Sequence, residues 1–497
     1  MKAREIAFKI LCDIEENNNY SNIAINKHFK NLKISNQDRG LATEIVYGVV
    51  ENKYYLDYVI NKLSKIKTQK LSICVKILLR MGIYQIAFLN SISDYAAVNE
   101  TVNLVKKYDK RSSGFVNAIL RNIIRNKDEI LNVDIENDDI MYLSTKYSYS
   151  PWMIKNFINS FGKDFTEDLI EANNEKPSIY LRTNTLKISR DELIEKLKEN
   201  GLKAYKVSII DEAIRVENLK DIENNELFKE GLFTIQDISS MMASKVLNPK
   251  ENSNALDVCS APGGKTTHIA TLMNNTGKVI SRDVFEHKLK LINNTVNRLG
   301  LTNVEVENFD ASILDENSIN KFDYVLADVP CSGLGIIRRK PEIKYKSKAE
   351  IKDLPVLQRK ILENASKYVK VGGNLLYSTC TILDSENIGN IIIYNTINCN
   401  DFAVVLNDGN NSNIIKANSL STIASSNILL VLNNMNNLIT ENYIENEFLG
   451  IFLVINNNNF NSISFNEFCK TSQDISIPKN SYNYVFDNTK YFIEDNE

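Results

Sequence analysis

Short apolar runs alternate with helical stretches or loops from Ala255 to about residue 378. A regular strand–helix alternation allows each strand to pair in parallel with an earlier one, while the helices cover both faces of the sheet. We therefore predict a doubly wound parallel sheet in this part of the chain. The runs of strand length are ALDVCS, KVISRD, VEVENF, FDYVLADV and GNLLYST.

The rest of the chain follows other patterns. Residues 1 to about 130 contain no proline and carry apolar residues at helical spacing, which predicts an all-α region. A mixed α/β pattern follows, and Asn-rich sequence without a visible repeat begins near residue 395. We expect four parts: helical residues 1–135, a linker and small α/β subdomain at 136–245, the sheet domain at 246–455, and an acidic, Asn-rich tail at 456–497.

Composition excludes several classes of protein. The 497 residues include seven scattered cysteines and only three histidines, without a C-x-x-C pair, so we expect neither a disulfide framework nor a metal site. No apolar run approaches the roughly 18 residues that span a bilayer, and acids follow the first apolar stretch directly. We therefore expect a cytoplasmic protein that does not enter a membrane.

The net charge of −3 is unevenly distributed along the chain. After residue 440, nine acids stand against three lysines, a net of −6, and residues 401–439 carry −1. The first 400 residues therefore carry +4, which suits a polyanionic partner.

A glycine-containing loop follows the first predicted strand of the sheet. Glycines there allow the backbone to approach a ligand closely at a helix N-terminus. The spacing is not that of a P-loop, because the first glycine of that motif is absent. The loop residues expected to bind a cofactor are Cys259, Ser260, Ala261, Pro262, Gly263, Gly264 and Lys265.

Three aspartates mark the ends of the next strands. Asp283 ends the second strand, about 20 residues past the glycines, where a carboxylate can accept both ribose hydroxyls. Asp310 follows the third strand, in position to reach an adenine edge, and Asp328 ends the fourth. Each could be an ordinary loop or cap residue, but together on one rim they predict a site for a nucleoside-bearing cofactor.

Two cysteines end strands on the same rim. Cys331 follows the fourth strand and Cys380 the fifth. A single cysteine is usually a small buried hydrophobe, whereas two beside a cofactor site favour nucleophilic chemistry.

These motifs resemble those of the RNA cytosine-C5 methyltransferase family, which implies a Rossmann-like class I domain binding S-adenosylmethionine. The N-terminal helices resemble the NusB-like RNA-binding fold, and this fusion is similar to bacterial members that modify 16S ribosomal RNA. The segments carrying the resemblance are D-x-C-x-A-P-G-G-K-T at 257–266, Asp328–Gly333, Ser378–Thr381, 181–187 and 231–240, and, for the helical part, 38–44, 47–48 and 114–121.

The resemblance also implies roles in catalysis. Cys380 would add to C6 of the cytosine as a thiolate, so that C5 attacks the methyl group of S-adenosylmethionine. Asp328 would hydrogen-bond the N3/N4 edge of the base, and Cys331 would act in the release of Cys380. Lys265 is a candidate for lowering the pKa of the Cys380 thiol. Cys259 is expected to pack within the cofactor loop.

The target cytosine must leave its stack to reach a thiol, so we expect a loop or flipped base of 16S rRNA as substrate and a monomeric enzyme. Two basic clusters are either solvated surfaces or phosphate contacts. The same chemistry on tRNA or 23S rRNA, and a non-catalytic RNA-binding assembly factor, remain alternatives. At the C-terminus, Gly450–Ile455 is only a loose counterpart of the family's last strand.

The first of the two basic clusters comprises Lys106, Lys107, Lys110, Arg111, Arg121 and Arg125. The second, which we expect beside the pocket, comprises Arg338, Arg339, Lys340, Lys344, Lys346 and Lys348.

Overall fold

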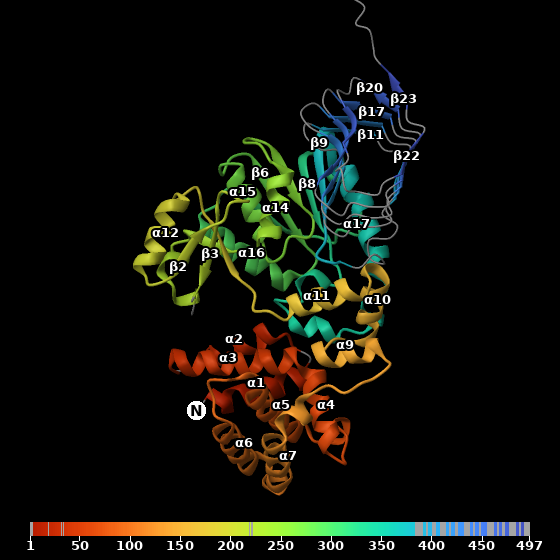
Figure 1. Cartoon of the computed structure of the whole chain (residues 1–497). Coiled ribbons are helices and arrows are strands. Elements are labelled where there is room, and N and C mark those ends of the chain that lie inside the picture. The colour runs from red at the N-terminus through yellow and green to blue at the C-terminus, as the bar shows by residue number, and fades with distance from the viewer. Residues whose placement is uncertain are drawn as a thin grey trace, which may run out of the picture. The chain divides into compact units, whose positions relative to one another are not determined.

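The structure is a computed structural model of the chain (Figure 1) and forms two compact units. One unit comprises residues 1–177 and 334–350, and the other comprises residues 178–333 and 351–497. Within the described residues, no helix is both long and apolar enough to cross a membrane. The structure describes residues 3–382 without 18, 31, 33, 218, 220 and 221, and the backbone of short strands between 391 and 491.

The first unit is helical, as its apolar spacing predicts. Helix α5 (Ile73–Phe88) is apolar around most of its circumference and lies at the centre of the core. The unit continues through α11 (Lys163–Asn173), so it includes residues 136–177, which were expected to lie with the small α/β subdomain. The other helices are α1 (Ala3–Asn17), α2 (Ser21–Phe29), α3 (Asn36–Glu51), α4 (Lys53–Leu63), α6 (Asp94–Tyr108), α7 (Ser113–Arg125), α8 (Lys127–Leu131), α9 (Asp139–Tyr147) and α10 (Pro151–Phe161).

The segment that follows the Pro-Cys motif also belongs to this helical unit. It contains the short 3₁₀ helices η5 (Leu334–Ile336), η6 (Pro341–Tyr345) and η7 (Lys348–Glu350). Lys344 is fully buried and donates to the carbonyl oxygens of Glu51 at 3.1 Å and Tyr147 at 3.2 Å. Its ammonium group also donates to Asn174 Oδ1 at 2.5 Å. Burial lowers the pKa of Lys344.

The expectation that this segment grips phosphate is therefore wrong for Lys344, whose ammonium group is enclosed by protein acceptors. Arg338 is also engaged, since it forms an ion pair with Glu175 at 2.7 Å. A run of basic residues looks the same in sequence whether its members are solvated or buried, and only the tertiary contacts distinguish them.

The second unit begins with a small antiparallel sheet of order β2-β3-β1-β4. Helix α12 (Arg190–Glu199) packs on it and begins at a capping box, in which Ser189 and Glu192 each bond the other's backbone N–H. This is the expected small α/β subdomain. Its remaining elements are β1 (Ile179–Thr183), β2 (Lys203–Lys206), β3 (Ala213–Glu217), η3 (Ile222–Asn224), α13 (Glu226–Lys229) and β4 (Phe233–Ile235).

A five-stranded parallel sheet of order β7-β6-β5-β8-β9 follows, which confirms the doubly wound prediction. The strands are added on one side of β5 up to β7 and then on its other side from β8, so the strand order reverses between β5 and β8. Open α/β sheets bind ligands at such a point. The strands are β5 (Asn254–Asp257), β6 (Lys278–Asp283), β7 (Val304–Asn308), β8 (Phe322–Asp328) and β9 (Val369–Ser378).

Alternating strand residues face opposite layers of helices. Ala255 and Leu326 pack into a core with helices α14–α16, whereas Leu256 and Val325 pack into a separate core with α17. This period of two places a helical layer on each face of the sheet. The helices are α14 (Ile238–Leu247), α15 (Gly264–Leu272), α16 (Glu286–Leu299) and α17 (Leu354–Tyr368), with the 3₁₀ turn η4 (Glu316–Ser318) before β8.

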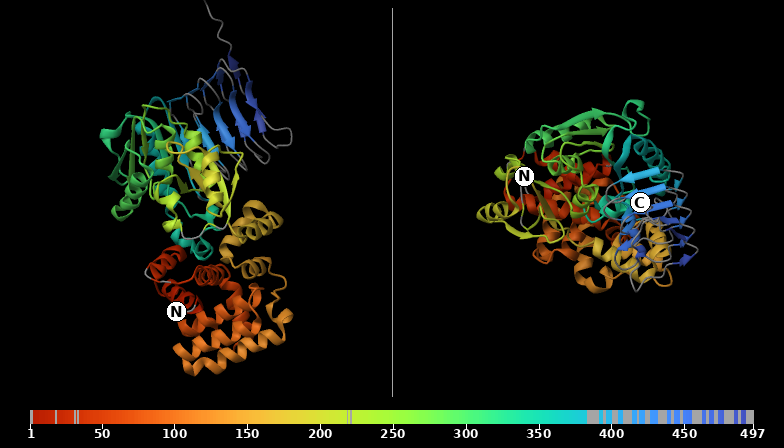
Figure 2. Two further views of the ribbon diagram at one scale, coloured as in Figure 1. Left: turned by 90° about the vertical axis from the view of Figure 1, so that its left-hand side faces the viewer. Right: turned by 90° about the horizontal axis from the view of Figure 1, so that it is seen from above.

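Fourteen short strands between residues 391 and 491 form three further parallel sheets, drawn in blue in Figure 2. Successive strands within each sheet begin 22 to 24 residues apart, an internal repeat that the sequence analysis did not detect. The expected boundary at residue 455 lies inside this series. The strands are β10 (Ile391–Ile393), β11 (Thr396–Cys399), β12 (Val404–Asn407), β13 (Ile414–Lys416), β14 (Ser419–Thr422), β15 (Ser426–Val431), β16 (Leu438–Thr440), β17 (Tyr443–Asn446), β18 (Leu449–Val454), β19 (Ser462–Ser464), β20 (Glu467–Cys469), β21 (Gln473–Ser476), β22 (Tyr484–Phe486) and β23 (Thr489–Tyr491).

Gly450–Ile455, the loose counterpart of the family's last strand, largely forms β18 of this series. Strand β18 pairs in parallel with β15 and β21, and the large sheet described above ends at β9.

Candidate active site

The glycine loop lies between β5 and α15, at the carboxyl edge of the large sheet. Gly263 has φ +97°, and a Cβ atom there would lie 3.2 Å from Ile292 Cγ2, so both backbone conformation and space favour glycine. Ser260 donates through its backbone N–H and its hydroxyl to the carbonyl oxygen of Arg282, each at 2.9 Å. These bonds hold the loop, which leads into helix α15, against the end of β6.

Asp283 is attached directly to this loop. Its Oδ2 accepts the Ala261 N–H at 3.1 Å and its Oδ1 accepts the Phe285 N–H at 3.0 Å. The carboxylate is therefore oriented by two backbone donors, and each oxygen keeps a further lone pair for a ligand. Asp310 accepts the Ser312 N–H at 2.8 Å at the neighbouring strand end.

The rim around the loop is acidic. Burial raises the pKa of the Cys259 thiol, and the negative charges of Asp257, Asp328, Asp283 and Asp310 raise it further. Cys259 is therefore held as a neutral thiol. A cluster of this sign suits a cationic ligand, such as one bearing a sulfonium group.

Asp257 stands apart within this cluster because it is fully buried. Burial raises the pKa of its carboxyl group to about 7, although Thr266 Oγ1 donates to Oδ2 at 2.7 Å. Its Oδ1 is buried without a hydrogen-bond partner among the described residues.

Asp328 and Lys265 form an ion pair of 2.6 Å between Oδ2 and Nζ. Both side chains keep some exposure, 29% and 17%, so the pair borders the open edge of the site. The ammonium group of Lys265 contacts Asp328, and its expected effect on Cys380 stays a prediction.

The two cysteine-bearing loops are joined to each other. The backbone N–H of Cys380 donates to Sγ of Cys331 at 3.2 Å, and both residues are half-buried. The hydroxyls of Ser332 and Thr381 share a buried hydrogen bond of 2.8 Å. The thiol–thiol hydrogen bond with Cys380 raises the pKa of Cys331, and burial adds to this effect.

Arg182 on β1 is a site residue to which the sequence analysis assigned no role. It is almost completely buried, and its guanidinium group donates to the Gly264 carbonyl oxygen at 2.6 Å and to Thr267 Oγ1 at 3.0 Å. It also donates to Gln236. Burial lowers its pKa to about 9. The arginine of the 181–187 segment thus supports the first turn of α15 from the small subdomain.

A second buried contact supports the same helix. His268 Nε2 lies 2.6 Å from Glu212 Oε1, and the side chains are only 1% and 7% exposed. Burial lowers the pKa of His268 to about 4, so a neutral imidazole donates to the carboxylate at neutral pH.

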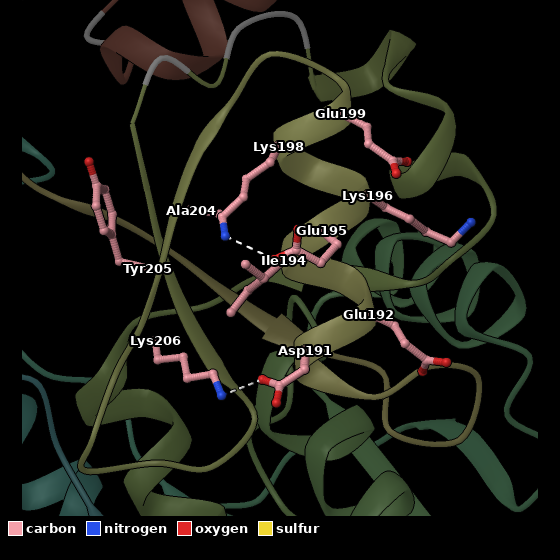
Figure 3. Close-up of a pocket in the computed structure, with 10 residues that line it drawn as sticks. All are labelled: Asp191, Glu192, Ile194, Glu195, Lys196, Lys198, Glu199, Ala204, Tyr205 and Lys206. Atoms are coloured by element: carbon pink, nitrogen blue, oxygen red, sulfur yellow. Dashed lines mark hydrogen bonds and ion pairs between the residues drawn. The ribbon is translucent and has the colours of Figure 1, made fainter.

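A separate open pocket of about 970 Å³ lies on the small subdomain, over α12 and β2 (Figure 3). Its charges are paired, because Lys206 lies 2.7 Å from Asp191 and Lys198 lies 2.9 Å from Glu195. None of the rim aspartates or cysteines lines it. We assign it no chemistry. Across the described part of the chain, no group of three or more His, Cys, Asp or Glu side chains could hold a metal ion.

Three protein-family models match the chain. The model described as 16S rRNA methyltransferase RsmB/F matches residues 244–420, the NusB family model matches 1–125, and the RsmF/B-like ferredoxin-like domain model matches 149–223.

Curated proteins and solved structures give the same result. The probable ribosomal RNA small subunit methyltransferase B of Bacillus subtilis is 39% identical over 388 residues, covering 77% of this chain and 86% of that protein. The ribosomal RNA small subunit methyltransferase B of Proteus mirabilis is 33% identical over 357 residues, covering 71% and 82%. The crystal structure of PH0851 matches with a TM-score of 0.64 and 27% identity, covering 78% of this chain and 88% of that one.

Proposed function

Since the chain belongs to the 16S rRNA methyltransferase RsmB/F family, we propose that it transfers a methyl group from S-adenosylmethionine to C5 of a cytosine in 16S rRNA. This membership confirms the expected fold of a NusB-like helical domain, a ferredoxin-like subdomain and a methyltransferase domain. The observation that carries the proposal is the direct contact between Cys331 and Cys380 on the acidic rim.

The rim fits S-adenosylmethionine, which supplies an electrophilic methyl group when bound. Its sulfonium charge is opposite in sign to the carboxylates around Cys259. Asp283, oriented by two backbone donors at the end of β6, would accept the ribose hydroxyls, and Asp310 would reach the adenine edge. The glycine loop and Lys265 complete this side of the site.

Three side chains of the protein then act on the base, each in a different step of the reaction. The Cys380 thiolate forms a bond to C6, which makes C5 nucleophilic enough to take the methyl group. Asp328, held by Lys265, hydrogen-bonds the N3/N4 edge and stabilises the charge that develops there. After transfer, the C5 proton passes to solvent water acting as the base, the C5–H electron pair restores the C5–C6 double bond, and the S–C6 electron pair leaves with Cys380 as a thiolate. Cys331, lying against Cys380, assists this elimination.

Transfer of a labelled methyl group to unmodified 16S rRNA tests the proposal. Wild type is expected to be active and Cys380→Ala inactive, because no C6 adduct can form. In Cys331→Ala a covalent protein–RNA adduct should accumulate on a denaturing gel, because release is blocked. Cys74→Ala, a free cysteine of the helical unit, is the matched control and should behave as wild type.

Each alternative has its own outcome. Activity on tRNA or 23S rRNA with none on 16S rRNA would reassign the substrate. Retained binding of S-adenosylmethionine with no transfer to any RNA would favour a non-catalytic assembly factor and contradict the proposal.

A further inference from the structure

The helical unit carries a groove between α6 and α7, with a volume of about 730 Å³. A short turn joins the two helices, so they run antiparallel (Figure 1), and an ion pair of 3.4 Å between Lys127 and Asp94 lies at one end. Val98, Val102 and Ile124 are apolar members of the lining. The groove is thus a mixed surface rather than an apolar patch.

The charge of this groove is entirely positive. Lys106 from α6 and Arg121 and Arg125 from α7 line it, and no acidic residue does. All three side chains are exposed, and among the described residues none of them forms an ion pair. Neighbouring Lys107 differs, because it is neutralised by Glu5 at 2.6 Å.

The groove also carries groups that suit nucleobases. Tyr95 is one of the lining residues, 76% of its surface is exposed, and it contacts no other aromatic ring among the described residues. Asn99 and Asn117 add amide donors and acceptors, and Asn117 accepts from Arg121 Nε at 3.0 Å, which orients the guanidinium group. Arg121 and Arg125 are one turn apart on α7, so their charges project along one line.

We propose that the α6–α7 groove binds a single-stranded segment of the RNA substrate. Lys106, Arg121 and Arg125 contact successive phosphates, and a base stacks on Tyr95. An acidic peptide would match the charge alone, whereas the exposed ring and the amides match unpaired bases as well. This inference rests on the proposed function for its RNA, but it concerns binding and not methyl transfer.

The test measures binding of the full-length protein to a fluorescent oligouridylate of about ten nucleotides, without S-adenosylmethionine, over a range of salt concentrations. Each lost phosphate contact should reduce the slope of log K against log[salt] by about 0.7. The triple variant Lys106→Gln/Arg121→Gln/Arg125→Gln should therefore lose a slope of about 2. Tyr95→Ala should weaken binding about fivefold or more, whereas Tyr95→Phe should retain it.

The matched control is Lys107→Gln/Lys110→Gln/Arg111→Gln, which removes the same formal charge from the same helix pair and its connecting turn but outside the groove. Equal loss in both triple variants, unchanged binding in the groove variant, or displacement of the RNA by polyglutamate at equal concentration would each overturn the proposal. Methyl transfer is measured separately. A wild type that binds the oligonucleotide through the groove but methylates no RNA would refute the proposed function and leave this inference standing.

Discussion

The backbone N–H of Cys380 lies 3.2 Å from Sγ of Cys331, so the residue proposed to attack the base is in contact with the one proposed to assist its release. The two residues follow different strands, β8 and β9, and are separated by 48 intervening residues that include a segment of the helical unit. Their contact is fixed by parallel pairing of the strands and by the Ser332–Thr381 hydrogen bond. The roles of residues near this contact can be tested by substitution.

Asp328→Asn should lower the methyl-transfer rate by about 100-fold or more, because a neutral amide replaces the carboxylate proposed to hydrogen-bond the N3/N4 edge of the base. Asp323→Asn is the control, since Asp323 lies on the same strand but pairs with Lys370 at 2.8 Å. Single-turnover rates at saturating RNA measure the effect. Equal rates in Asp328→Asn and wild type would remove Asp328 from the chemistry.

Arg182 should act as a positioning residue for the cofactor loop. Replacing it with Lys keeps a positive charge but cannot serve the Gly264 carbonyl, Thr267 and Gln236 together. We expect the KM for S-adenosylmethionine to rise about tenfold while kcat changes less, because the loop is displaced and the cysteines are not. Arg190→Lys, at a partly exposed arginine of α12, is the control. A fall in kcat alone would contradict the positioning role.

His268 should make the second unit sensitive to acid. Its pKa is about 4 in the folded protein against 6.5 in an unfolded chain, so the unfolded state binds the extra proton between these values. The stability that it contributes is complete above pH 6.5 and is lost as the pH falls to 4, by about 3 kcal/mol.

Hydrogen exchange of a peptide from α15 measures this dependence in wild type and His268→Gln. The glutamine can still donate to Glu212 but cannot take up a proton, and Asp257 titrates alike in both proteins. Protection in wild type should therefore decline relative to the variant from pH 6.5 to 4. Parallel pH profiles would show that His268 does not titrate as described.

Two glycines allow strain and steric clash to be separated. Gly231 and Gly201 have φ values of +72° and +77°, so alanine costs about 1 kcal/mol of backbone strain at either position. At Gly231 the added Cβ would also lie 1.9 Å from the Arg298 carbonyl oxygen, whereas at Gly201 nothing lies within 4 Å. Gly231→Ala should therefore lower the melting temperature clearly more than Gly201→Ala. Equal shifts would mean that the backbone relaxes around residue 231.

Local patterns predicted the large sheet and the position of the glycine loop and the strand-end aspartates at its carboxyl edge. The alternation of apolar runs is a direct consequence of parallel strands covered on both faces, and Gly263 and Asp283 occupy positions that such a fold assigns to cofactor binding. Arg182 could not be assigned a role in the same way, because its partners lie more than 50 residues away in sequence. The repeat after residue 391 was missed because its strands are only three to six residues long and are separated by Asn-rich sequence of varying composition.

The burial of Lys344 has a consequence for how this protein can be divided. The carbonyl oxygens of Glu51 and Tyr147 and the amide of Asn174 receive their hydrogen bonds from a lysine that arrives more than 160 residues later in the chain. A fragment that ends at residue 177 would lack Lys344, so these acceptors would lose their hydrogen-bond donor. A methyltransferase fragment that begins at residue 178 would contain Lys344 without the residues that bury it. The two units are thus interleaved in sequence, and neither is a transferable module, so swapping the helical unit between relatives requires exchanging residues 334–350 with it.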